Sequence, residues 1–598
     1  MIRASRTLPL VILLGGAALP VVAQQEEHEG GDFQRRRQAW FDDRRAYPNA
    51  QMNWEAYVSS RRSFVSRRNA FASFASASSG SWLPMGPGGF FGLGYWDSGA
   101  QVDAGRVDAI ALHPTAPGTM LIASPNGGVW RTITNGASWD PVFESQCTLQ
   151  MSTLRIDPVN PNIVYAGAAY ASGASGCALF RSTDGGSTWT DWNGGLNFTA
   201  YNSGFINALY IDPASAGSTT ATTLMFNFGG AGIYRSTNSG GSWSRALTFG
   251  YVTSIVGLPS TPGIVFAGVA DYASSSSTRS GVYRSADNGA SWTQVASGAL
   301  DFTNAGRLQV ATSAAQPGSV WVLAATKGSR YLSLSRWDEG ASQLLALDAA
   351  GVDLRDNSRA HFGTQGTYDL ALAVDPADAR RVYIAGVRAF RSVDGGAQFR
   401  PMATEIHCDW HELVADPRNR GRLYAGTDGG VFTSSDGGDS WTSLNNGLVI
   451  SMFYPGIAQH PTDANVVLGG LQDNGSLISN GTQLFGAVTG GDGGYAAINP
   501  QAPSTIYTTC QWSRSAGPCI YRRSPTSFTF RTSGIVVADR AQFIPPLVMD
   551  PSTPTTLYFG TMCSIALPTR ARSGRPCRWT SPRARGASRP SPSPRPTR

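Results

Sequence analysis

The sequence has little charge and, beyond its first residues, no long apolar run. Only 15% of its 598 residues are Asp, Glu, Lys or Arg, which disfavours a protein built from exposed amphipathic helices. No interior apolar run is long enough to cross a bilayer, so no stable membrane span is expected. The Cys-x-x-Cys metal pattern and the GxSxG, HExxH and phosphate-loop motifs of several enzyme classes are missing too.

The net charge of +7 does not indicate a nucleic-acid partner. Residues 570–598 contain nine arginines and no acidic residue, so the rest of the chain is close to neutral. We therefore predict no nucleic-acid binding and a disordered Arg/Pro-rich tail over 569–598. The repeat pattern described below breaks off before this tail. A frameshifted or truncated gene would produce that break.

The first residues have the pattern of an export signal. Arg3 and Arg6 precede an apolar stretch from Leu8 to Leu14, and Ala23 provides a small residue for cleavage. Residues 1–23 are therefore predicted to be a signal peptide, and the protein is predicted to be secreted or periplasmic. Cysteines can pair in such compartments. Cys510 with Cys519 is a plausible hairpin disulfide and Cys147 with Cys177 a weaker one, although spacing alone does not fix the pairing.

Residues 24–80 are predicted to be a partly helical extension and linker. Their arginine pairs suit either a docking surface or, preferably, a solvated helix face. From residue 81 the chain repeats, which decides the fold. Ten strand-like runs follow an Asp-Pro or similar turn, as after Asp157-Pro158, Asp375-Pro376 and Asp416-Pro417.

This repetition predicts an all-β protein, a β-propeller of four-stranded antiparallel blades. Residues 81–448 are expected to form a seven-bladed ring, and residues 449–568 the blades of a second, incomplete propeller. One ten-bladed ring is the alternative.

A second motif, Ser/Thr-x-Asp-x-Gly-x-Ser/Thr-Trp, accompanies most repeats, with its full form at Ser182–Trp189. Its acid or amide is expected to accept backbone N–H groups across a tight turn, where the glycine supplies a positive φ. Because a group present in every blade serves every blade, we interpret these residues as structural: Asp184, Asn238, Asp287, Asp394 and Asp436.

These turns resemble the Asp-box, or bacterial-neuraminidase, repeat of sialidases, xyloglucanase-type glycoside hydrolases, sortilin-type receptor domains and photosystem assembly factors. Residues from about 81 to 525 are also similar to large exported bacterial proteins described as glycosyl-hydrolase-like or sortilin-like. Six segments carry that resemblance: Gly105–Ile110, Gly127–Arg131, His407–His411, Gly426–Val431, Gly470–Gly475 and Gly490–Gly494. It implies a propeller fold and says little about a reaction.

His407, Asp409 and His411 alternate along the chain, so on a strand they would share one face. Two imidazoles and a carboxylate there suit a divalent metal ion, the only cofactor that the sequence suggests. They equally suit a polar lining or an organic-ligand site.

Asp428, Asp473 and Asp492 lie in glycine-rich turns and are the catalytic candidates. Gln472 and Asn474 flank Asp473 as predicted ligand-binding residues, although turn chemistry also explains acids and amides in such places. Glycoside hydrolysis generally needs two carboxyl groups. The first-blade segment Ala123–Gly128, where xyloglucanase-type relatives carry one of them, has none.

Two function classes therefore remain. The first, and preferred, is a binding scaffold for an extracellular protein, peptide or polysaccharide. The alternative is a carbohydrate-active glycoside hydrolase of the xyloglucanase or sialidase-like propeller type, with its catalytic groups between His407 and Asp492.

Overall fold

The structure is a computed structural model. It describes residues 37, 40, 56, 58–66, 86–91, 101–169, 177–196, 204–272, 277–298, 300–347, 365–479, 481–512, 517–525, 527–533, 535, 539, 541–561 and 564–568. The predicted signal peptide (1–23), most of the predicted extension and the predicted tail (569–598) lie outside these residues. No helix in the described part is long and apolar enough to cross a membrane.

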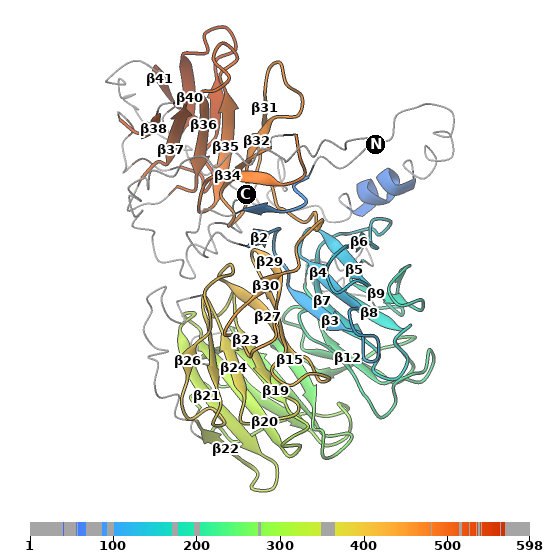
Figure 1. The fold of residues 1–598 in the computed structure, drawn as a ribbon. Helices are drawn as coiled ribbons and strands as arrows, with labels where there is room; N and C mark the ends of the chain where they lie inside the picture. Colours follow the sequence, from blue (N-terminus) through green and yellow to red (C-terminus); the bar gives the residue numbers. More distant parts are fainter. Residues whose placement is uncertain are drawn as a thin grey trace, which may run out of the picture.

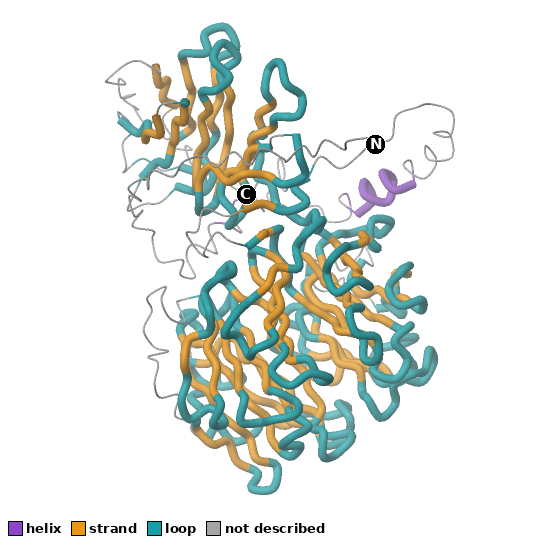
Figure 2. Tube along the Cα trace, viewed as in Figure 1, coloured by secondary structure: helices purple, strands orange, loops and turns teal. Residues whose placement is uncertain are grey.

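Seven four-stranded antiparallel sheets follow one another along the chain from residue 109 to residue 443 (Figures 1 and 2). Their strands are, in blade 1, β3 (Ala109–Leu112), β4 (Met120–Ser124), β5 (Gly128–Thr132) and β6 (Asp140–Pro141); in blade 2, β7 (Met151–Ile156), β8 (Val164–Ala168), β9 (Leu179–Ser182) and β10 (Thr190–Asp191); in blade 3, β11 (Leu209–Ile211), β12 (Leu224–Asn227), β13 (Ile233–Ser236) and β14 (Ser244–Leu247); in blade 4, β15 (Tyr251–Gly257), β16 (Val265–Ala270), β17 (Gly281–Ser285) and β18 (Thr293–Gln294); in blade 5, β19 (Ala305–Thr312), β20 (Ser319–Thr326), β21 (Tyr331–Asp338) and β22 (Gln343–Ala346); in blade 6, β23 (Ala371–Val374), β24 (Val382–Ala385), β25 (Ala389–Ser392) and β26 (Arg400–Pro401); and in blade 7, β27 (Trp410–Ala415), β28 (Leu423–Thr427), β29 (Gly430–Ser434) and β30 (Thr442–Ser443).

The seven blades close into one ring, which confirms the preferred arrangement over the ten-bladed alternative. The first strand of each blade contacts the first strand of the next, and β27 of blade 7 contacts β3 of blade 1. A separate buried apolar cluster fills each of the seven interfaces between neighbouring blades. At the closure, Ile122 and Trp130 of blade 1 pack with Tyr424 and Val431 of blade 7. Burial of these faces is the main source of the ring's stability.

Three further sheets follow the ring and form the upper group in Figure 1. The first has six strands in the order β2 (Val102–Asp103), β1 (Phe90–Phe91), β34 (Phe485–Thr489), β33 (Ser476–Ile478), β32 (Val467–Gly470) and β31 (Ala458–Gln459). The second contains β35 (Gly493–Ile498), β36 (Ile506–Cys510), β37 (Ile520–Ser524) and β38 (Ser527–Phe530), and the third contains β39 (Leu547–Met549), β40 (Thr556–Gly560) and β41 (Ser564–Pro568). Strand β1 pairs in parallel with β34, so the chain before the ring completes a sheet made after it. The predicted boundaries at 81 and 448/449 stay predictions.

The short polar side chains of the repeated turns bond within their own turns. In each case the side-chain oxygen accepts the backbone N–H four residues further on, at 2.8–3.0 Å. The residues concerned are Asp184, Asn238, Asp287, Asp394 and Asp436. Because these oxygens are engaged locally, the turns fasten the third strand of a blade to its fourth.

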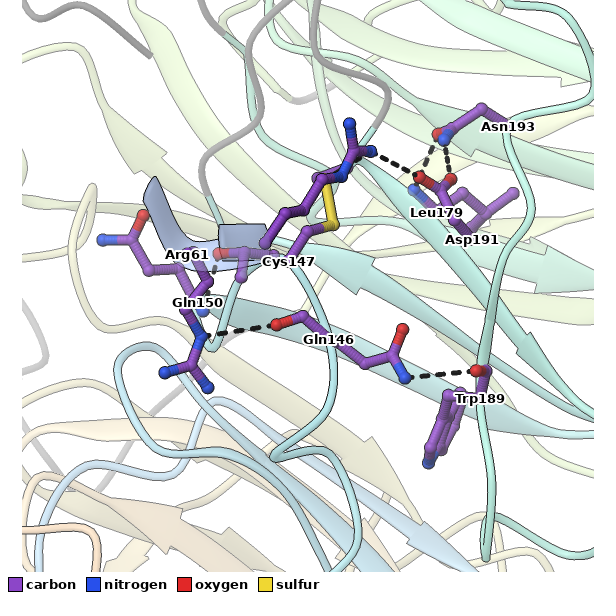
Figure 3. The surroundings of a disulfide bond; sticks show 11 residues. Arg61, Gln146, Cys147, Gln150, Leu179, Trp189, Asp191 and Asn193 are labelled. Atoms are coloured by element: carbon purple, nitrogen blue, oxygen red, sulfur yellow. Dashed lines mark hydrogen bonds and ion pairs between the residues drawn. A yellow bond between two sulfur atoms is a disulfide. The ribbon is translucent and has the colours of Figure 1, made fainter. Parts of the chain in front are cut away.

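Both cysteine pairs favoured by the sequence are bonded. Cys510 and Cys519 bridge a hairpin, and Cys147 and Cys177 join blade 1 to blade 2. Around the bridge between Cys147 and Cys177, the Gln146 side chain donates to the Trp189 carbonyl at 3.1 Å (Figure 3). Arg61, in the helical segment 58–66, donates to the Gln146 carbonyl at 3.3 Å. The extension therefore docks beside this disulfide.

Replacing Cys147 with serine is expected to lower the free energy of unfolding by about 3 kcal/mol, because the bridge closes a loop of 30 residues in the unfolded chain. Denaturant unfolding of Cys147→Ser, Cys177→Ser and the double variant measures this loss. Each single variant removes the same bond, so the double variant should be about as stable as either one. Additive losses would contradict a shared cross-link.

Candidate functional site

A cavity of about 910 Å³ occupies the centre of the seven-bladed ring. The first strands of the blades surround it. Its wall includes residues of β3, β7, β15, β19, β23 and β27 and, in blade 3, Asn207 and Ala208 just before β11. We call this cavity the channel. Channels and mouths of propellers are common ligand sites, because each blade contributes residues to one concave surface.

Arg37, Arg106 and Tyr368 lie together in one part of the channel lining, which we call the end wall. The Cζ atoms of Arg106 and Arg37 lie 4.6 and 5.2 Å from the centroid of the Tyr368 ring. Arg37 comes from the N-terminal extension and is only 3% exposed. Its burial corrects the expectation that the extension's arginines lie on a solvated face, since this guanidinium is docked inside the molecule.

Asp428 lies directly behind the end wall. It accepts hydrogen bonds from His411 Nε2 at 2.8 Å and from the Tyr368 hydroxyl at 2.9 Å, and Arg106 Nε is 3.7 Å away. Burial alone would raise the pKa of Asp428, but His411 and the two end-wall arginines outweigh it and hold that pKa well below its usual range. Asp428 is therefore an ionised anchor for His411, Arg106 and Tyr368.

Asp473 and Asp492 hold Arg37 from the same side. Arg37 Nη1 lies 2.5 Å from Asp473 Oδ2 and 3.8 Å from Asp492 Oδ1. The Tyr454 hydroxyl donates to Asp492 at 2.9 Å, and the amide of Asp473 donates to Asp492 at 3.1 Å. Burial, followed by the charge of Asp473, raises the pKa of Asp492 to about 7. Asp428, Asp473 and Asp492 are 1%, 7% and 1% exposed, and none of the three is among the described residues that line the channel.

The predicted ligand-binding amides join the same cluster. Gln472 lines the channel and donates from Nε2 to Asp473 Oδ2 at 3.0 Å. Asn474 donates from Nδ2 to the carbonyls of Asp428 and Gln472, each at 3.0 Å. The structure thus brings together the candidate catalytic and ligand-binding residues between 407 and 492, of which Gln472 and His411 are the described ones that face the channel.

His407 and Asp409 lie before the strand on which the sequence placed them. Strand β27 begins at Trp410, and Asp409 has a φ of +62°, which no regular strand residue adopts. His407 places Nδ1 2.9 Å from the Cys408 carbonyl and Nε2 3.2 Å from the Asp473 carbonyl. Both nitrogens then donate, which requires an imidazolium. Burial lowers the pKa of His407, but Asp103, the Cys408 carbonyl and Asp428 raise it to about 9.

This arrangement does not fit the predicted metal ion, because an imidazole that donates from both nitrogens has no lone pair left for a metal. A metal site usually needs at least three His, Cys, Asp or Glu side chains close together. In the described part of the chain, one such group has its ligand atoms within 4.8 Å of one another: Cys147, Cys177 and Asp191. Two of them form a disulfide and offer no thiolate. We derive no step through a metal.

Two carboxylates that sequence reasoning did not single out face the channel: Asp108 and Glu412. Arg106 donates to Asp108 from Nε at 2.6 Å and from Nη2 at 3.3 Å. Burial raises the pKa of Glu412; Arg155 and Arg307 oppose that shift, and Asp108 adds to it. The register of β27 against β28 shifts between Trp410 and Glu412, and this irregularity lets the neighbouring residues His411 and Glu412 both line the channel.

No family model matches the chain. A curated xyloglucanase from Hypocrea jecorina is 30% identical over 100 residues, which make up 17% of this chain and 12% of that protein. The match thus covers about an eighth of the relative's length.

Among solved structures, an ancestral GH74 enzyme is similar with a TM-score of 0.56 and 15% identity, over 82% of this chain and 69% of that one. A GH74 enzyme from Niastella koreensis gives a TM-score of 0.47 and 17% identity, over 80% and 79% of the two chains. At these identities the first likeness supports the fold alone. The fold and its blades define the chain as an all-β propeller protein. That its repeated turns belong to the Asp-box family stays a prediction.

Proposed function

We propose that this chain is an exported glycoside hydrolase that acts on a polysaccharide in the channel. The partial sequence similarity to a xyloglucanase and the propeller fold shared with an ancestral GH74 enzyme support this class. Hydrolysis of a glycosidic bond needs one carboxyl group that donates a proton and one carboxylate that acts as base or nucleophile. The channel offers such a pair in Glu412 and Asp108.

The observation that carries the proposal is the contrast between the environments of these two groups. Arg106 binds Asp108 through two charge-assisted hydrogen bonds. Burial raises the pKa of Glu412, and the charge of Asp108 adds to that effect, as suits a group that donates a proton. A carboxyl group held by an arginine and a buried carboxyl group with a raised pKa suit the roles of base and acid.

The three carboxylates predicted from the sequence take a supporting role in this proposal. Asp428 orients His411 and Arg106, and through Arg106 it positions Asp108. Asp473 and Asp492 hold Arg37 in the end wall. The carboxylates behind the wall therefore position the groups in front of it, as a second layer of contacts does in many enzyme sites.

Turnover on a panel of neutral and acidic polysaccharides, measured as new reducing ends, tests the proposal. We expect hydrolysis of at least one polymer by the wild-type chain. Asp287→Asn, which alters an exposed turn carboxylate far along the chain from the site, should retain that activity, whereas Asp108→Asn should lose it. A panel without turnover by folded protein would contradict a hydrolase.

A binding scaffold for a peptide or glycan is the second candidate. It is favoured by the burial of Asp428, Asp473 and Asp492 behind the end wall, where no ligand touches them unless the wall moves. For this candidate, residues 81–448 form the ring that contains the channel. Residues 449–568 form the blades of a second, incomplete propeller. Saturable binding of a polysaccharide without new reducing ends would select it over the hydrolase.

A further inference from the structure

The charges on the channel wall are mostly positive. The described lining residues include five cationic side chains and two carboxylates: Arg37, Arg106, Arg155, Arg307 and Lys327, against Asp108 and Glu412. Asp473 and Asp492, which hold Arg37, do not line the channel, whereas Asp108, which binds Arg106, does. The lining therefore carries more positive than negative groups. Such a surface suits a negatively charged ligand.

Two of these cations, Arg307 and Arg155, donate to backbone carbonyls. Arg307 donates from Nη1 to the Tyr368 carbonyl at 2.6 Å, and Arg155 donates from Nη1 to the Leu154 carbonyl at 2.8 Å. Neither forms an ion pair with a described residue, although the charge of Glu412 acts on both from a greater distance. Guanidinium groups bound to carbonyls alone retain donors for a carboxylate.

Asp369 is a buried acid whose charge acts on Arg307. Burial, followed by the charge of Asp409, raises the pKa of Asp369 well above its usual range. Burial also lowers the pKa of Arg307, and Asp369 and Asp108 offset only part of that effect. An anion bound at Arg307 would relieve this imbalance.

An aromatic surface lies next to Arg307 in the same wall. Phe205 and Tyr251 are stacked, with ring centroids 5.8 Å apart and planes 23° apart, and Tyr272 packs against Tyr251 at 5.7 Å. All three line the channel, and Tyr272 is 43% exposed. Arg307 lines the same channel, and its charge acts on the Tyr272 hydroxyl. A flat aromatic face beside a cation suits an apolar ring that carries a negative substituent.

We propose that this part of the channel binds an acidic sugar residue, with its ring against Tyr251 and Tyr272 and its carboxylate on Arg307, assisted by Arg155. The inference rests on the proposed function for taking the ligand as a glycan, and it narrows the substrate to a polysaccharide that contains uronic acids. An acidic peptide would satisfy the arginines but has no sugar ring for the aromatic face.

Calorimetric titration at low salt with galacturonate and glucuronate oligosaccharides, and with neutral oligosaccharides of matched length, tests the inference. The acidic sugars should bind at least about tenfold more tightly than the neutral ones, because a charge-assisted hydrogen bond is stronger than a neutral one. Arg307→Met should remove that preference, Arg307→Lys should keep part of it, and Tyr272→Ala should weaken both classes of sugar. Arg380→Met, at an arginine whose side chain is 72% exposed, should change nothing.

Equal affinity for neutral and acidic sugars, or an unchanged preference in folded Arg307→Met, would overturn the inference. If polyglutamate binds as tightly as the uronides, and its affinity is unchanged in Tyr272→Ala, the sugar assignment is wrong and a peptide ligand is favoured. Uronide binding that depends on Arg307, without hydrolysis, would contradict the proposed hydrolase activity but support the acidic-sugar site. Hydrolysis of neutral polymers alone would support the hydrolase activity but contradict the acidic-sugar site.

Discussion

Replacing Glu412 with glutamine is expected to lower kcat on a hydrolysed polysaccharide by a factor of about 10²–10⁴, the contribution typical of a positioned general acid. The substitution preserves the shape of the side chain and removes its proton. Burial raises the pKa of Glu412, so in the wild-type chain activity should fall as pH rises through that pKa. Initial rates across a pH series, for wild type and Glu412→Gln, measure both effects.

The pH profile separates a catalytic role from a merely structural one. If Glu412 is the acid, the glutamine variant should lack the alkaline limb of the profile, and substrates with good leaving groups should lose less activity than the natural polymer. Thermal unfolding should stay close to wild type, because glutamine preserves the size and shape of the side chain. A variant that keeps both its rate and its alkaline limb would exclude Glu412 as the acid.

Much of the fold could be predicted because it repeats. A blade buries its faces only against neighbouring blades, so its apolar strands and its glycine turns recur along the chain and can be counted. The pairing of β1 with β34 could not be found in this way. Strand β1 has only two residues, and Phe90 pairs with Phe485, 395 positions further along the chain. Such a short strand leaves no periodic signal in the sequence, so its pairing with β34 depends on long-range packing.

The candidate site could be predicted only in part. His411 and Asp428 were found because they lie in distinctive motifs, and they do bond to each other. Glu412 was missed because strand alternation turns it away from the face of His411, and the irregularity at the start of β27 cancels that alternation. Arg37 was missed because a run of arginines in an extension resembles a solvated segment, and nothing local reveals that Asp473 and Asp492 receive one of them.

Replacing Arg37 with methionine is expected to lower the free energy of unfolding by about 3–5 kcal/mol at neutral pH, the usual cost of removing one partner from a buried ion pair. Arg37 is 3% exposed and lies 2.5 Å from Asp473 Oδ2. Without it, Asp473 and Asp492 remain buried with no guanidinium between them. Burial already raises the pKa of Asp492 to about 7, and loss of Arg37 should raise it further. Denaturant unfolding of both proteins measures the difference.

The sign of the pH dependence identifies the cause of that loss. A carboxyl group with a raised pKa in the folded state favours folding when protonated, so the variant's deficit should shrink as pH falls below about 7 and grow above it. Asp473→Asn in the Arg37→Met background removes one of the stranded charges and should recover part of the stability, while Asp473→Asn alone should be destabilising because it leaves Arg37 short of its nearest partner. Asp473→Asn should thus destabilise the wild-type chain but stabilise Arg37→Met. Such a reversal requires direct contact between Arg37 and Asp473. A deficit that is independent of pH, with additive losses in the double variant, would show that Arg37 acts through packing alone.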